Sequence, residues 1–180
     1  MQITVSRKET KHWIDKLETS AEVSMLSIAN LAADNDAMSF LYECKFHENG
    51  FDPLDSTKPL NFVEQLNQTF TYLASFKGAE YIFAKHDDVK SLTLNLGTSK
   101  GTDIETVDGG GVVAEVFASV DPTNNSKIQK DIKRIRLNSA KHKYVFFISP
   151  KTDSGIYNSK WDDDGVTVIS FGDGSSKEKI

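Results

Sequence analysis

The chain has 180 residues and a formal net charge of -5 at pH 7, with 26% charged residues. A chain of this length can bury one sizeable core, and the net negative charge argues against a surface coated with nucleic-acid-binding charge. One cysteine, Cys44, excludes an internal disulfide, and no zinc-ligand spacing surrounds it. There is neither an apolar stretch of membrane-spanning length nor a signal-peptide pattern, so we expect a soluble cytoplasmic protein without a membrane partner.

Positive charge is concentrated in one segment, residues 123–151. This segment holds eight basic residues and one acidic residue, which gives it +7 and leaves -12 for the remainder of the chain. Such polarity suits a protein with one phosphate-facing side, and a solvated helix surface explains it equally well.

The first 57 residues are predicted to form an N-terminal helical extension. Thr19 and Glu22 have the spacing of a capping box, so a helix should begin there, and a second helix is expected over residues 37–47. Residues 51–59 contain two prolines and are interpreted as a connection.

Residues 58–171 are predicted to form an α/β core with a mixed central β-sheet flanked by helices. Apolar spacing indicates a helix from residue 60 to about residue 78 and another that ends near Asn138. Strands are expected over residues 91–96, 102–107, 112–120, 143–149 and 166–171. Residues 172–180 should form a polar tail.

Two acidic residues occupy consecutive predicted strands. A tight turn over residues 108–111 would pair those strands and bring Asp103 beside Glu115, although twelve positions separate them in the sequence. Two adjacent carboxylates repel each other, and a hard divalent cation relieves that repulsion while keeping positions for water and phosphate oxygens. The pattern therefore indicates a candidate metal site.

Residues 101–117, GTDIETVDGGGVVAEVF, resemble the signature hairpin of the PD-(D/E)XK nuclease superfamily. The resemblance covers roughly residues 60–171 and implies a restriction-endonuclease-like fold. It implies that Asp103 and Glu115 bind Mg²⁺ or Mn²⁺, and that Glu64, on the preceding helix, is a third metal ligand. It also implies a divalent-metal-dependent nuclease that hydrolyses DNA phosphodiester bonds.

The sequence departs from the family pattern at one position. The family has a lysine two residues after the second acid, where this chain has Phe117. Phenylalanine neither carries charge nor donates a hydrogen bond. In one explanation Lys127, on the following helix, replaces the missing lysine as a catalytic residue, and Lys127, Lys130 and Arg134 form a nucleic-acid-binding strip.

In the other explanation, Phe117 marks a catalytically inactive restriction-like domain that binds DNA or a protein. The N-terminal helices would then be a surface for a protein partner, and a homodimer is compatible with either explanation. The sequence alone leaves both functions open.

Overall fold

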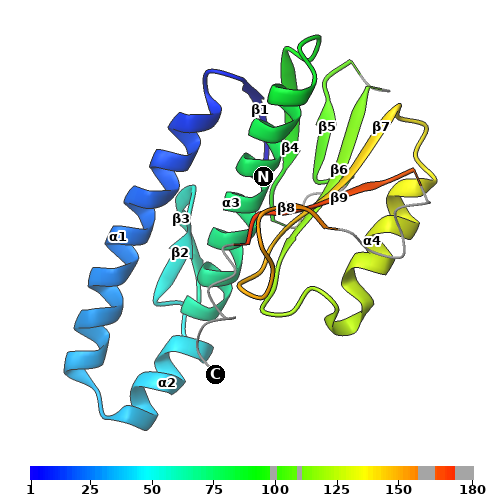
Figure 1. Ribbon diagram of the computed structural model, residues 1–180. Coiled ribbons are helices and arrows are strands. Elements are labelled where there is room, and N and C mark those ends of the chain that lie inside the picture. Colours follow the sequence, from blue (N-terminus) through cyan, green and yellow to red (C-terminus); the bar gives the residue numbers. More distant parts are fainter. Residues whose placement is uncertain (98–100, 109–110, 158–164, 173–180) are drawn as a thin grey trace.

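The computed structural model describes residues 1–97, 101–108, 111–157 and 165–172. Most of the predicted tail and the central turn residues 109 and 110 lie outside these ranges. The described part is an α/β arrangement in which two helices, α3 (Phe62–Lys85) and α4 (Lys127–Arg136), lie on opposite sides of a β-sheet (Figure 1). Two further helices, α1 (Thr10–Asp34) and α2 (Ala37–Phe46), lie beyond α3.

The central sheet of the described residues has seven strands in the order β1-β4-β5-β6-β7-β9-β8. Strands β1, β4, β5 and β6 pair antiparallel, β6, β7 and β9 pair parallel, and β8 pairs antiparallel with β9. The prediction of a mixed sheet is therefore confirmed. The strand bounds are β1 Gln2–Ser6, β4 Ser91–Asn95, β5 Ile104–Thr106, β6 Val112–Ala118, β7 His142–Ile148, β8 Gly155–Ile156 and β9 Thr167–Ser170.

Strand β6 separates two apolar cores because its successive side chains point to opposite faces. Its even-numbered residues Val112, Ala114 and Val116 belong to the core beneath α3, Phe62–Lys85. Val113 and Phe117 belong to the core beneath α4, Lys127–Arg136. The odd-numbered Glu115 therefore faces α4.

The N-terminal region is not the purely helical extension that we predicted. Strand β1 is the edge strand of the central sheet, and the buried Val5 and Leu17 belong to the core beneath α3. The predicted capping box is also wrong, because α1 runs without interruption from Thr10 to Asp34. Within it the hydroxyl of Thr19 donates to the carbonyl of Asp15.

The second predicted helix is present as α2, Ala37–Phe46, and Asp36 caps its first turn. The expected connection that follows it is instead a small hairpin of β2, Gly50–Asp52, and β3, Asp55–Leu60. Polar contacts fix this hairpin, because Tyr72 of α3 donates a hydrogen bond to its buried Asp52.

Helix α3 continues past the predicted end near Gly78 and reaches Lys85. Gly78 lies inside the helix and close to the sheet, because an added Cβ would lie 2.7 Å from Cδ2 of Phe146 and 3.1 Å from Cδ1 of Ile104. The glycine thus permits close helix-to-sheet packing.

Candidate functional site

Asp103 immediately precedes β5 and bonds to the backbone of the neighbouring strand β6. The pairs Ile104 with Ala114 and Glu105 with Val113 set the register, which places Asp103 across from Glu115. The Oδ2 atom of Asp103 accepts a 2.7 Å hydrogen bond from the backbone N–H of Val116. The Asp103 side chain thus continues the β5–β6 hydrogen-bond ladder by one acceptor. Asp103 therefore lies next to the strand that carries Glu115.

Glu115 is fully buried and paired with an arginine from α4. The Nε atom of Arg134 donates to Oε1 of Glu115 at 2.8 Å, and the guanidinium also contacts Oε2. The exposed fraction of the Glu115 side chain is 0%, whereas that of Arg134 is 56%. The ion pair therefore joins a buried carboxylate to a guanidinium that still reaches solvent.

Lys127 lies over the residue that replaces the family lysine. Its Nζ atom is 5.6 Å from the centroid of the Phe117 ring and donates a 2.9 Å hydrogen bond to Oδ1 of Asp131. Phe117 is buried and stacks on Phe147. An ammonium group from α4 consequently lies above the ring at position 117.

Asp131 is a site residue that the sequence analysis missed. Only 4% of it is exposed, and its Oδ2 atom is buried without a hydrogen-bond partner in the described structure. A signal was present in the sequence, because position 131 lies three residues after Ile128 and four before Ile135, on the buried face of α4.

Burial raises the pKa of the Asp131 carboxyl, and the charge of Asp103 raises it further, while the hydrogen bond from Lys127 opposes the change. Burial likewise raises the pKa of Asp103, against the lowering effects of the Val116 N–H and of Arg134 and Lys127. Each of these acids is therefore less readily ionised than an exposed aspartate.

Replacing Asp131 by asparagine should change how stability depends on pH. Because the folded-state pKa of Asp131 is raised above 3.8, the wild type loses stability as pH rises from that value through the folded-state pKa. The asparagine variant lacks this loss. The free energy of unfolding can be measured with urea in EDTA between about pH 3 and pH 7. As pH rises over this range, the value for the wild type should fall relative to the value for Asp131→Asn. A rise of the wild-type value relative to the variant would contradict this.

The other predicted site residues lie differently. Glu64 forms the capping box of α3 with Asn61 and is exposed. Among the described residues, no three histidine, cysteine, aspartate or glutamate side chains could hold one metal ion, so the structure does not bring Glu64 to Asp103 and Glu115. Lys130 is exposed on α4 beside the site.

Charges of both signs meet in the cluster. Asp103, Glu115 and Asp131 are three acids, and Lys127, Lys130 and Arg134 are three bases that act on them. The charges balance when all six groups are ionised, so a cation bound by Asp103 and Glu115 would take the place of the Arg134 guanidinium. Mg²⁺ is usually held by one or two carboxylates with water and substrate phosphate, so a two-carboxylate site suits it without Glu64.

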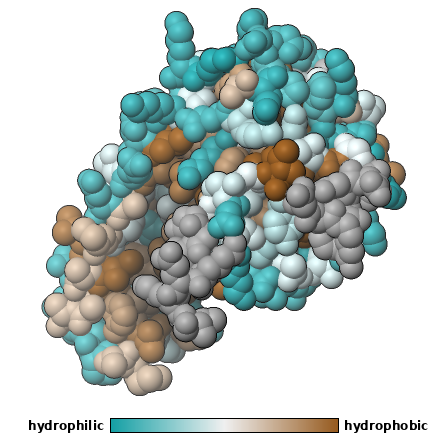
Figure 2. Space-filling view, in the orientation of Figure 1, coloured by the Kyte–Doolittle hydropathy of each residue, from teal (hydrophilic) through white to brown (hydrophobic). Residues whose placement is uncertain are grey.

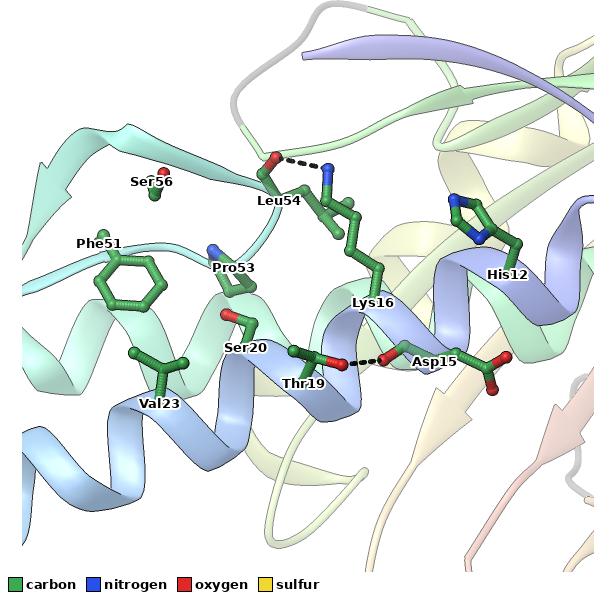
Figure 3. Close-up of a pocket in the computed structure, with 10 residues that line it drawn as sticks. All are labelled: His12, Asp15, Lys16, Thr19, Ser20, Val23, Phe51, Pro53, Leu54 and Ser56. Carbon is green, nitrogen blue, oxygen red and sulfur yellow. Dashed lines mark hydrogen bonds between the residues drawn. The ribbon is translucent and has the colours of Figure 1, made fainter.

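A separate hollow of about 570 Å³ lies between α1 and the β2–β3 hairpin (Figure 3). The Nζ atom of Lys16 crosses to the hairpin and donates to the carbonyl of Leu54. In Figure 3 the hydroxyl of Ser20 points from α1 toward Pro53. Because Lys16 already holds the hairpin, we interpret this hollow as part of the packing between hairpin and helix.

Comparisons with protein-family models, with curated proteins and with solved structures found no match to this chain. Over the residues that the structure describes, no helix combines the length and apolar character needed to cross a membrane.

Proposed function

We propose that the chain is a divalent-metal-dependent nuclease with a restriction-endonuclease-like core, hydrolysing DNA phosphodiester bonds. The observation that carries the proposal is the Lys127 ammonium above the Phe117 ring, beside an acid pair on the β5–β6 hairpin. The chain order α3, β4, β5, β6, α4, β7 also agrees with the order expected of such a core.

In this proposal Asp103 and Glu115 hold Mg²⁺ or Mn²⁺. Such an ion, when bound, lowers the pKa of a water and offsets negative charge on the phosphoryl group. Lys127 then donates hydrogen bonds toward the phosphate oxygens, with Asp131 keeping its ammonium in place. Glu115 must release part of its pairing with Arg134, which leaves that guanidinium free to contact a phosphate.

The solvent-exposed parts of a basic strip on α4 would bind the DNA backbone. Lys127, Lys130 and Arg134 follow one another at steps of three and four residues, so they form one strip along the helix. Phosphate contacts of this kind bind DNA without reading its sequence and weaken as salt rises. The basic segment thus places its charge next to the acids.

Plasmid and single-stranded DNA, incubated with the protein in Mg²⁺, Mn²⁺ or EDTA, test the proposal directly. We expect cleavage in either metal and none in EDTA. A calorimetric titration with Mn²⁺ alone should show binding, independently of turnover. Intact DNA in both metals, or no heat of Mn²⁺ binding, would overturn the assignment.

The Lys127→Gln variant should cleave DNA about 10²- to 10³-fold more slowly, because it removes a charge aimed at the developing negative charge. Glutamine can still donate a hydrogen bond to Asp131, so folding should be retained. Initial cleavage rates at saturating DNA provide the measurement.

Lys130→Gln is the matched control for Lys127→Gln. It should weaken DNA binding slightly and leave the rate at saturation unchanged. Equal rates for the two variants would show that Lys127 does not replace the family lysine.

A second candidate function is non-catalytic binding of DNA or a protein, and the pairing of both Glu115 oxygens with Arg134 favours it. This candidate predicts DNA binding without Mn²⁺ binding. A protein partner could use α2, none of whose residues is buried and which exposes Met38, Leu41, Tyr42 and Phe46. Figure 2 shows apolar residues gathered over α1 and α2, at the lower left.

A further inference from the structure

A second hollow, of about 580 Å³, lies where α3 meets the carboxyl ends of the parallel strands. From α3 it is lined by a stripe of residues spaced by three or four positions, Leu66, Phe70, Leu73 and Lys77, together with Asn67. From the strands it is lined by Ala118, Ser119 and Val120 at the end of β6, Ile148, Ser149 and Pro150 at the end of β7, and Phe171 and Gly172 after β9. Its size lies in the range of small-molecule sites.

The lining combines aromatic, polar and cationic groups. Phe70 and Phe171 supply the aromatic rings, and 48% of Phe70 is exposed. Lys77 is the one charged residue among the lining residues. The hydroxyl of Ser119 is buried and has no hydrogen-bond partner in the described structure, so it would reach a ligand in the hollow only after its side chain rotates.

The hollow lies at the same end of the sheet as the acid site. Asp103 accepts a hydrogen bond from the backbone N–H of Val116. Ala118, two residues further along β6, lines the hollow. Glu115 faces α4, whereas the hollow lies beneath α3, so the two occupy opposite faces of the sheet at the carboxyl end of β6. A DNA strand that contacts both would pass around this end of the sheet.

We propose that this hollow receives an unpaired nucleotide of a DNA strand, with its base against Phe70 and its phosphate at Lys77. An aromatic ring can stack on any base, the amide of Asn67 can hydrogen-bond to a base edge, and a cation meets the phosphate. A paired base cannot enter such a hollow. The inference rests on the proposed function and names single-stranded or locally unpaired DNA as its substrate.

Fluorescence anisotropy in EDTA measures this binding without turnover, using a labelled single strand of about 12 nucleotides and, separately, its duplex. Phe70→Leu, which removes the aromatic ring and keeps an apolar side chain, should weaken single-strand binding about tenfold. Lys77→Gln should weaken it by a smaller factor and flatten its salt dependence. Duplex binding should change little in either variant.

The matched controls are Phe46→Leu, on the exposed face of α2, and Lys11→Gln, on α1. Both should bind the single strand as the wild type does, and unchanged melting temperatures would show that all four variants fold. The inference is overturned if Phe70→Leu binds like Phe46→Leu, or if it weakens duplex and single strand equally.

Failure of the inference can be separated from failure of the proposed function. Loss of single-strand affinity in Phe70→Leu, with no cleavage by the wild type in Mg²⁺ or Mn²⁺, would support the hollow and reject the nuclease. Cleavage by the wild type, with full single-strand affinity in Phe70→Leu, would support the nuclease and reject the hollow.

Discussion

Asp103→Asn should lower metal-dependent DNA cleavage by about a thousandfold or more. If Asp103 binds the metal ion, removing its charge costs several kcal/mol of transition-state stabilisation, and about 4 kcal/mol corresponds to a thousandfold rate change. Asparagine retains a side-chain oxygen that can accept the hydrogen bond from the Val116 N–H, so the β5–β6 pairing should persist. Plasmid cleavage rates in Mn²⁺ and the affinity for Mn²⁺ provide the measurements.

The matched control is Asp108→Asn, an exposed aspartate at the other end of the same hairpin. It should retain wild-type cleavage and Mn²⁺ affinity. Wild-type activity in Asp103→Asn would remove this residue from the site. Lost activity with an unchanged Mn²⁺ affinity would mean that Asp103 acts without binding the metal.

Arg134→Met should destabilise the fold by about 3 kcal/mol. Breaking a buried ion pair by removing one partner typically costs 3–5 kcal/mol, because the remaining charge is left in the protein interior. We expect the lower end of that range because Arg134 is 56% exposed, so water can partly replace its guanidinium. The free energy of unfolding in urea, at pH 7 and without metal, gives the comparison.

Two further variants isolate the cause. Lys133→Met, at an exposed position on α4, should change stability by less than about 0.5 kcal/mol. The double variant Glu115→Leu with Arg134→Met should recover most of the loss, because apolar residues often replace a buried pair without cost. No recovery in the double variant would show that the effect of Arg134 does not arise from the charge of Glu115.

Local sequence patterns, in which the residues concerned are only a few positions apart, predicted the central strands and helices of the fold. The apolar strands around β6 and β7 and the isoleucine spacing of α4 were sufficient, because burial on one or both faces imposes a recognisable period. The hairpin that places Asp103 across from Glu115 followed from two strand patterns and a glycine-rich segment. The structure agrees with these predictions for the residues that it describes.

Elements that depend on distant partners could not be predicted in the same way. Strand β1 has only one buried residue, Val5, so its sequence gave little sign of a place in the central sheet. Its partner β4 supplies the pairing. Thr19 has the chemistry of a helix cap, yet α1 continues through it because contacts with α3 stabilise the longer helix.

The sequence predicted which charged residues lie at the candidate site, but not which of them pair with one another. Arg134 was placed on a DNA-facing strip, and its bond to Glu115 depends on how α4 crosses β6. Asp131 was treated only as a charge within a basic segment. Its burial depends on how α4 is rotated about its axis against the sheet. The spacing of the isoleucines limits that rotation, and the packing of α4 on the sheet fixes it.

The pairing of β1 with β4 has a consequence for folding. Gln2 pairs with Asn95, so during synthesis β1 leaves the ribosome long before its partner exists. Until then its backbone hydrogen-bonding groups have no strand to join, and later β4 presents an open edge until β1 docks. Contacts so far apart in sequence slow folding and leave unpaired strand edges that favour aggregation. Refolding yield should therefore depend on protein concentration more strongly than the small size of the domain would suggest.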